Sequence, residues 1–163
     1  MYGYVKVGSA VPKLRVADCV YNKEEILKLV EAAAAKQVRV LSFPELSVTG
    51  YTCADLFFQA PLLHTAEQAI QEIAEATEAL NIFLLIGAPI AVDNQMFNCA
   101  VALYRGKLLG IVPKTHIPNY SEFYEERWFA SADDLLTEEI TYAGQNVPIG
   151  ADLIFAAADF PAL

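Results

Sequence analysis

The strongest constraint on the fold is a helical hydrophobic pattern that is followed at once by an extended one. Apolar side chains recur at helical spacing, and Asn22 with Glu25 three residues later is typical of an N-cap with its capping box, so a helix is expected over residues 22–36. The next segment, 38–43, is a short β-prone run that stops at a proline. With a weakly alternating strand at 5–11, the order strand–helix–strand predicts an α/β layered fold.

The rest of the chain continues this alternation and adds an antiparallel part. The pair Asp93-Asn94 predicts a turn, and the two-residue connection Arg105-Gly106 between apolar runs is typical of a hairpin. The further expected elements, in order, are a helix at 61–80 closed by Asn81, a buried strand at 82–87, strands at 97–104 and 108–112 joined by Arg105-Gly106, a long ordered loop with a short helical turn over 113–135, and short strands at 140–142 and 153–155.

The acidic composition narrows the possible partners. Of the 163 residues, 11 are Lys or Arg and 20 are Asp or Glu, which gives a net charge of −9. Non-specific nucleic-acid binding needs basic side chains that neutralise phosphates, so no nucleic-acid partner is expected. The apolar runs are far shorter than the ~20 residues of a membrane-spanning helix, and no signal-peptide pattern opens the chain. We therefore expect a cytoplasmic protein without a membrane partner.

Cysteine and histidine usage favours neither a disulfide framework nor a metal site. Cys19, Cys53 and Cys99 are odd in number and widely spaced, as expected for reduced thiols. Cys99 lies in an apolar run and is expected to be a core residue, whereas Cys53 is a nucleophile candidate without an adjacent base. The two histidines, His64 and His116, are far apart, so no metal is expected.

The first segment that could carry chemistry surrounds Glu45. Glu45 follows an apolar strand and Pro44 directly, and the carboxyl ends of strands in α/β sheets are where ligands bind. Apolar neighbours would desolvate a carboxylate there, and desolvation makes it a better general base near neutral pH. The competing interpretation is a solvated glutamate at the start of a loop.

The second segment surrounds Lys114, which also follows an apolar strand and a proline. A lysine in such a position can stabilise a developing oxyanion and hold a nearby thiolate. The competing interpretation is a surface lysine after a hairpin. Residues 122–129 then mix charges with aromatics, which predicts either a lid or pocket wall, or an aromatic cluster under a loop.

Together the two segments are more specific than either alone. Residues 43–46 with 49–51, and Pro113-Lys114 with the Phe-Tyr-Glu stretch at 123–125, resemble the glutamate and lysine motifs of the nitrilase, or carbon–nitrogen hydrolase, superfamily. Motif resemblance is a hypothesis that the structural context must support.

One branch of that superfamily is especially similar. Residues 48–57 and 113–125 resemble the glutaminase domain of glutamine-dependent NAD⁺ synthetases, and the likeness includes 87–89 and 150–155. Residues 1–163 are therefore interpreted as the N-terminal part of a carbon–nitrogen hydrolase domain, without the synthetase domain.

The resemblance implies an α/β fold of a particular kind, a four-layer α-β-β-α sandwich, incomplete here, with a Glu–Lys–Cys triad. Glu45 matches the general base, Lys114 the oxyanion-stabilising lysine, and Glu125 a second glutamate that supports the lysine. Tyr51 and Tyr120 match positions that line the glutamine pocket. In this family a cysteine thiolate attacks the glutamine amide, ammonia departs, and water releases glutamate from a thioester, which divides one difficult acyl transfer into two easier steps.

The chain departs from the family pattern at the nucleophile. The family's Cys-Glu-Asp motif is expected after the segment 159–163, and Cys19, Cys53 and Cys99 do not match its position. We therefore expect the chain alone to be inactive, with ATP and Mg²⁺ bound only by the synthetase domain and no cofactor in these residues. An incomplete sandwich exposes apolar sheet surface, so a homo-oligomer is expected.

Three functions compete. The first is glutamine amide hydrolysis that supplies ammonia for ATP-dependent NAD⁺ synthesis from deamido-NAD. The second is another nitrilase-family amidase that acts on a different small amide. The third is a non-catalytic fragment used for assembly or binding.

Overall fold

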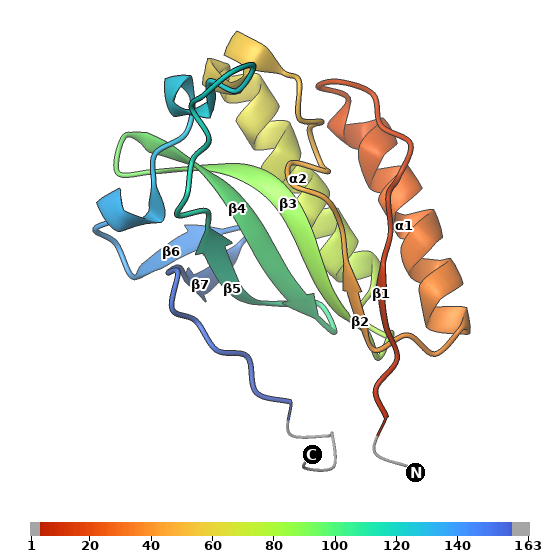
Figure 1. The fold of residues 1–163 in the computed structure, drawn as a ribbon. Coiled ribbons are helices and arrows are strands. Elements are labelled where there is room, and N and C mark those ends of the chain that lie inside the picture. The colour runs from red at the N-terminus through yellow and green to blue at the C-terminus, as the bar shows by residue number, and fades with distance from the viewer. Residues whose placement is uncertain (1–3, 158–163) are drawn as a thin grey trace.

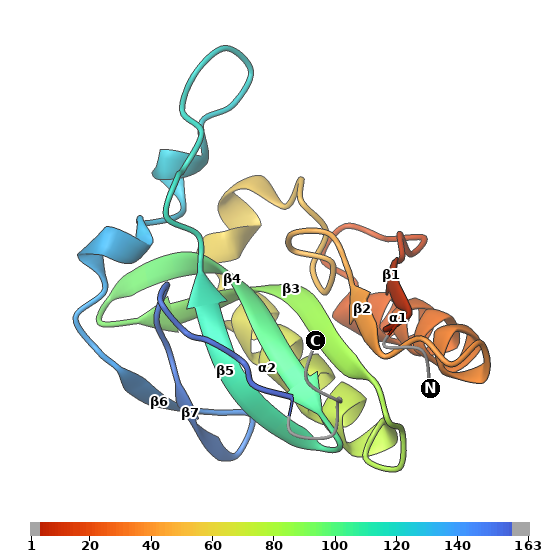
Figure 2. The same ribbon diagram turned by 60° about the horizontal axis from the view of Figure 1, so that its bottom comes forward.

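The computed structural model describes residues 4–157 and shows two helices packed on one face of a five-stranded sheet (Figures 1 and 2). The strand order is β1-β2-β3-β4-β5, in which β1, β2 and β3 are parallel while β4 is antiparallel to both neighbours. The strands are β1 Val7–Ser9, β2 Val40–Ser42, β3 Phe83–Val92, β4 Gln95–Tyr104 and β5 Lys107–Pro113. The expected strand–helix–strand order is confirmed.

Helix α1, Cys19–Ala35, begins three residues before the predicted helix. Its N-cap is Asp18, whose carboxylate accepts the Tyr21 N–H at 3.0 Å, so the predicted cap at Asn22 is wrong. Asn22 is fully buried inside the helix, where its side chain bonds the backbone of Arg15 and Val48. The local pattern could not reveal these tertiary partners.

Helix α2, Ala60–Ala76, turns its apolar face to the sheet, as its periodicity predicts. It ends four residues earlier than expected, and Asn81 does not close it. The Thr77 hydroxyl donates to the carbonyl of Ile73 at 2.8 Å and lies 3.2 Å from that of Ala74, and a hydroxyl that binds last-turn carbonyls competes with further helix.

Two tight turns build the antiparallel part of the sheet. Asp93 and Asn94 both have positive φ between β3 and β4, as do Arg105 and Gly106 between β4 and β5. Positive φ at both central residues is the mark of a type I′ turn, whose twist fits the flanking strands. The predicted turn at Asp93-Asn94 and the predicted hairpin at Arg105-Gly106 are confirmed, and the strands that they join are longer than expected.

The C-terminal part differs from the sequence-based expectation. Strand β6, Glu139–Tyr142, is confirmed, and it pairs with β7, Gln145–Pro148, which was not predicted. The expected strand at 153–155 is absent, because this stretch pairs with no strand. Leu153 and Phe155 instead pack on the sheet at Gly110, where an added Cβ would lie 2.9–3.0 Å from their side chains.

The two faces of the sheet are covered differently. Leu84, Ile86 and Ala88 of β3 point toward the helices and are at most 1% exposed. On the other face Leu85 is only partly buried, and there the segment after β7 crosses β5 and β4 (Figure 2). The described residues thus form one helix layer and one sheet layer, which is the arrangement expected for one half of the α-β-β-α sandwich that the resemblance implies.

The connecting segments that contain the short 3-10 turns gather at one end of the sheet. The 3-10 turn η1, Ala54–Phe58, precedes α2, and the predicted long loop after β5 contains η2, Glu125–Arg127, and η3, Ala132–Asp134. This loop projects from the body of the molecule (Figure 2). Among the described residues, no helix is both long and apolar enough to cross a bilayer.

Candidate functional site

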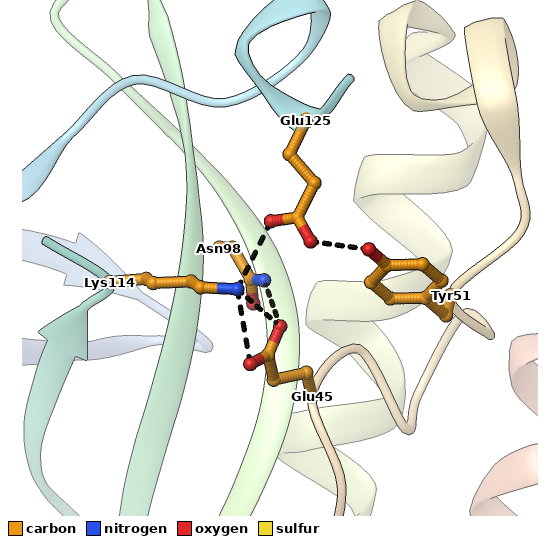
Figure 3. A network of polar contacts seen from close by, with 5 residues as sticks. All are labelled: Glu45, Tyr51, Asn98, Lys114 and Glu125. Carbon is orange, nitrogen blue, oxygen red and sulfur yellow. Dashed lines mark hydrogen bonds and ion pairs between the residues drawn. The ribbon is translucent and has the colours of Figure 1, made fainter. Parts of the chain in front are cut away.

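Strand direction brings Glu45 and Lys114 together. Strands β2 and β3 are parallel, and two successive antiparallel pairings make β5 run in the same direction as β3. The carboxyl ends of β2 and β5 therefore lie at the same edge of the sheet, and Glu45 and Lys114 follow these two ends. Figure 3 shows both side chains directed into one polar cluster with Asn98, Glu125 and Tyr51.

Lys114 is the centre of this cluster. Its Nζ lies 2.9 Å from Oε2 and 3.1 Å from Oε1 of Glu45, and 3.1 Å from Oε2 of Glu125. Burial alone would lower the pKa of Lys114, but the hydrogen bonds and charges of the two carboxylates outweigh burial and raise it. The lysine is therefore held as a cation, which is the form that stabilises an oxyanion.

A close backbone approach at Gly87 positions Glu45. A Cβ added to Gly87 would lie 2.3 Å from the Leu46 nitrogen and 2.4 Å from the Pro44 carbonyl oxygen. Leu46 itself is fully buried with a φ of 52°, and the Gly87 carbonyl accepts the Val48 N–H at 3.1 Å. The turn that carries Glu45 thus rests on the backbone of β3, where only glycine leaves enough room.

Backbone hydrogen bonds fix Lys114 from both sides. Its N–H donates to the Asn98 carbonyl on β4 at 2.8 Å, and its carbonyl accepts the Ala132 N–H of η3 at 3.0 Å. The lysine therefore stays in register with the sheet although it begins a long loop.

Glu125 is the buried carboxylate of the cluster. Its side chain is 4% exposed, against 24% for Lys114 and 51% for Glu45. The expectation that apolar neighbours desolvate Glu45 is therefore wrong, because Glu45 lies on the open side of the cluster. The desolvated carboxylate is that of Glu125. Hydrogen bonds from Lys114 and from the Tyr51 hydroxyl offset the free-energy cost of removing it from water.

The two tyrosines that the resemblance assigns to substrate occupy different places. Tyr51 donates its hydroxyl to Oε1 of Glu125, and burial together with this bond raises the pKa of Tyr51. Tyr120 is 68% exposed, and its ring packs edge-on against Phe123 at 5.8 Å. In the described structure no hydrogen bond joins Tyr120 to the cluster, so the fold brings together Tyr51, Glu45, Lys114 and Glu125.

Two contacts of the site were not predicted. Asn98 of β4 donates from Nδ2 to Oε2 of Glu45 at 2.8 Å (Figure 3), and the available signal was a polar residue inside the apolar run 97–104. Asp55 of η1 accepts two bonds from Arg127, both 2.7 Å, and one from the Trp128 indole at 3.0 Å. These bonds hold the pKa of Asp55 well below its usual range.

The segment 122–129 includes an aromatic cluster under a loop. Phe57 meets Phe129 edge-on with ring centroids 5.0 Å apart, and it meets Trp128 at 6.0 Å. Phe129 is 3% exposed and belongs to the core. Packing of this kind, together with the Asp55–Arg127 pair, ties η2 and hence Glu125 to η1.

Comparison with known proteins identifies the family. The family model described as carbon-nitrogen hydrolase matches residues 6–155, which includes Glu45, Lys114 and Glu125. The chain belongs to the carbon–nitrogen hydrolase family. The resemblance read from the sequence motifs, and the nitrilase-like α/β fold that it implies, are confirmed.

Relatives of this carbon–nitrogen hydrolase include several glutamine-dependent NAD(+) synthetases. A glutamine-dependent NAD(+) synthetase of Mycobacterium tuberculosis is 34% identical over 160 residues, which is 98% of this chain and 23% of the relative. One from Aquifex aeolicus is 34% identical over 125 residues, covering 77% of this chain and 22% of its own length. The chain thus spans about a quarter of the length of these curated relatives.

Solved structures show the same fold. The glutamine-dependent NAD(+) synthetase of Cytophaga hutchinsonii superposes with a TM-score of 0.86 at 29% identity, over 95% of this chain and 26% of that chain. An amidase from Nesterenkonia sp. gives a TM-score of 0.67 at 18% identity, over 90% of this chain and 55% of that chain. The amidase shares the fold alone.

The three cysteines of this carbon–nitrogen hydrolase are all buried and free. Burial, with smaller contributions from Cys53 and Asp18, raises the pKa of Cys19 to about 12, and burial also raises the pKa of Cys53 and of Cys99. The Cys53 thiol lies within hydrogen-bond distance of the carbonyls of Thr49 and Gly50, at 3.2 and 3.3 Å. Cys99 is a core residue, as expected, and Cys53 lacks the properties of a reactive thiolate.

Outside the cluster, the arrangement of metal-ligating side chains and the clefts of the fold bear on ligand binding by the described residues. Within residues 4–157, no group of three or more His, Cys, Asp or Glu side chains is arranged to hold a metal. A cleft of about 440 Å³ lies between α2 and β6, lined by His64, Glu67 and Thr141 among others. The residues of the Glu45–Lys114–Glu125 cluster do not line it. The expected nucleophile position follows 159–163, which lies outside the described residues.

Proposed function

We propose that this chain supplies the glutamate and lysine of a centre that hydrolyses the side-chain amide of glutamine, so that ammonia becomes available for ATP-dependent NAD⁺ synthesis from deamido-NAD. The observation that carries the proposal is the contact of Lys114 Nζ with Glu45 and Glu125 at 2.9–3.1 Å. The similarity to proteins named glutamine-dependent NAD(+) synthetase supports glutamine as the substrate.

The proposed reaction assigns one role to each side chain. Glu45 takes the proton of a cysteine thiol, the sulfur bonds to the amide carbon, and the carbonyl oxygen becomes an oxyanion that Lys114 stabilises. The carbon–nitrogen bond then breaks, and the proton from Glu45 leaves with the nitrogen as ammonia. Water attacks the thioester, gives a proton to Glu45, and releases glutamate while that proton returns to the sulfur. Glu125 holds Lys114 in place throughout.

The thiol in this scheme comes from outside residues 1–163. Cys19, Cys53 and Cys99 are buried, and in the described structure none of them hydrogen-bonds to Glu45, Lys114 or Glu125. The 163-residue chain alone should therefore release no ammonia from glutamine, because removal of a triad nucleophile abolishes most of the rate.

The remaining partners follow from the same proposal. Tyr51 and Tyr120 would line the glutamine pocket, and Tyr51 would in addition fix Glu125 through its hydroxyl. A synthetase domain would bind ATP and Mg²⁺ and use the ammonia. The natural protein would act in the cytoplasm and form a homo-oligomer.

The deciding experiment reads the coding sequence past Leu163 and expresses the complete reading frame. Glutamine-dependent ammonia release and NAD⁺ formation are then measured for the wild type, Glu45→Gln and Lys114→Met, with Lys28→Met, an exposed lysine on α1, as the control. The first two variants should lower kcat by at least about 10³-fold, and the control should not.

Two results would replace the proposal. Hydrolysis of small aliphatic amides in place of glutamine would favour another amidase of the family. A reading frame without a suitable cysteine, with no other chain to supply one and no amide hydrolysis, would favour a non-catalytic assembly or binding role.

A further inference from the structure

We propose that Asn98 is a positioning residue that makes the two oxygens of Glu45 unequal and leaves Oε1 as the oxygen that exchanges the proton. The proposal deepens the proposed function and rests on it, because it concerns the general base of the same reaction.

Asn98 is bonded to both groups of the candidate site. It lies in β4 opposite Pro89 and is 3% exposed. Its Nδ2 donates to Oε2 of Glu45 at 2.8 Å, and its backbone carbonyl accepts the N–H of Lys114 at 2.8 Å. A carboxylate only accepts hydrogen bonds, so the amide nitrogen must be the atom that faces Glu45. A single residue of the sheet therefore sets where Glu45 lies relative to Lys114.

The two carboxylate oxygens of Glu45 have different partners. Oε2 accepts hydrogen bonds from the Asn98 amide at 2.8 Å and from Lys114 Nζ at 2.9 Å, whereas among the described residues Oε1 accepts only from Lys114 Nζ, at 3.1 Å. An oxygen with two short donors has less capacity to bind a proton, because protonation would break one of those bonds. Oε1 is therefore the oxygen that takes the thiol proton and later gives it to the departing nitrogen.

Asn98 differs from Asn22, another buried asparagine of the described structure. The Asn22 side chain makes three hydrogen bonds to backbone groups of Arg15 and Val48, each 2.8–2.9 Å, and so holds loops together. Among the described residues, the Asn98 side chain hydrogen-bonds to the Glu45 carboxylate, which is half-exposed. The structure assigns Asn22 to folding and Asn98 to the orientation of a functional group.

The test uses glutamine hydrolysis by the protein expressed from its complete reading frame, with kcat calculated per folded molecule. Asn98→Ala should lower kcat by about 10- to 100-fold with a much smaller change in KM, since misplacement of a base affects chemistry more than binding. Asn98→Ser keeps a donor and should retain more kcat than Asn98→Ala.

Asn98→Asp provides a readout that a purely structural role would not produce. At about pH 8 the introduced carboxylate repels Glu45, so kcat should fall below that of Asn98→Ala. At about pH 5.5 a fraction of it is protonated and can donate to Oε2 again, so kcat relative to wild type should recover. Asn22→Asp is the matched control, a buried asparagine changed in the same way, and it should show no such recovery per folded molecule.

The outcomes separate the two proposals. A wild type that does not hydrolyse glutamine overturns the proposed function and this inference with it. An active wild type whose Asn98→Ala variant keeps full kcat at every pH overturns the inference alone. Acid recovery in Asn22→Asp equal to that in Asn98→Asp also overturns it. If Asn98→Asp does not fold, the order of kcat between Asn98→Ser and Asn98→Ala decides.

Discussion

At the cluster of Glu45, Lys114 and Glu125, one lysine faces two carboxylates that differ in exposure. Glu125 is almost fully buried, and hydrogen bonds from Lys114 and Tyr51 offset the cost of burying its charge. Glu45 is half-exposed and can be approached from solvent. This difference in exposure fits two separate roles. The buried carboxylate of Glu125 positions the lysine, and the exposed carboxylate of Glu45 accepts and donates protons.

The first prediction concerns the pH dependence of stability. Burial alone would lower the pKa of Lys114, but Glu45 and Glu125 raise it above the ordinary value of 10.5. The folded state therefore binds this proton more tightly than the unfolded chain. The contribution of protonated Lys114 to the free energy of unfolding is therefore fully present below pH 10.5. This contribution is lost as the pH rises through the folded-state pKa of Lys114.

Lys114→Met should accordingly destabilise the chain by about 1–3 kcal/mol at neutral pH, since it leaves the Glu125 carboxylate buried without its cation. The difference from wild type should shrink above pH 10.5. Urea unfolding at several pH values measures this. A difference that grows between pH 10.5 and more alkaline pH would contradict the sign.

The second prediction concerns the thiols. Burial raises the pKa of all three cysteines, and that of Cys19 to about 12. Only a small fraction of each thiol is therefore deprotonated at about pH 8. A disulfide reagent such as Ellman's should find no reactive thiol in the folded chain and three in guanidinium. Reactivity should rise only with strongly alkaline pH or unfolding. Fast reaction of Cys53 in the folded state would restore it as a nucleophile candidate.

At the scale of elements, the periodic parts of the chain were predictable and the parts fixed by tertiary contacts were not. The helices, β3 to β5 and both hairpin turns follow from hydrophobic period and turn residues. β7 was missed because its residues, Gln145–Pro148, have little apolar pattern and depend on pairing with β6. Leu153 and Phe155 look like a strand in sequence, but their apolar side chains cover Gly110 of the sheet.

The candidate site shows the same limit. Strand-end positions predicted that Glu45 and Lys114 would lie at an edge of the sheet, and strand direction brings them to the same one. Asn98 could not be assigned, because its partner is 53 residues away in sequence and reaches it only through the pairing of β3 with β4.

The third prediction tests how β3 positions Glu45. In Gly87→Ala the new Cβ would meet backbone atoms of Leu46 and Pro44 at 2.3 and 2.4 Å, so the turn that carries Glu45 must move. We expect a loss of about 2–4 kcal/mol in stability and, in the complete protein, a loss of glutamine hydrolysis. Gly8→Ala in β1 is the matched control, because its Cβ would meet a side chain at 3.4 Å, an ordinary contact. Equal thermal midpoints for the two variants would contradict this account.

At the scale of the whole molecule, helices cover only one of the two faces of the five-stranded sheet in the described structure (Figure 2). Helices α1 and α2 cover that face (Figure 2). On the other face the side chains of Phe83, Leu85 and Val112 are only partly buried. In the described structure the segment with Leu153 and Phe155 covers part of that face, and the Phe83 and Phe155 rings lie 5.5 Å apart. Contiguous apolar surface of this kind favours association.

The fourth prediction is that the 163-residue chain self-associates through this face, against the repulsion of its net charge of −9. Salt screens charge repulsion but not apolar contact, so association should strengthen as ionic strength rises. Sedimentation velocity over a range of protein and salt concentrations measures it. Leu85→Lys places a charge on the helix-free face and should shift the chain toward monomer without loss of helical circular dichroism. A wild type that is monomeric at every concentration would mean that the segment after β7 covers the face sufficiently.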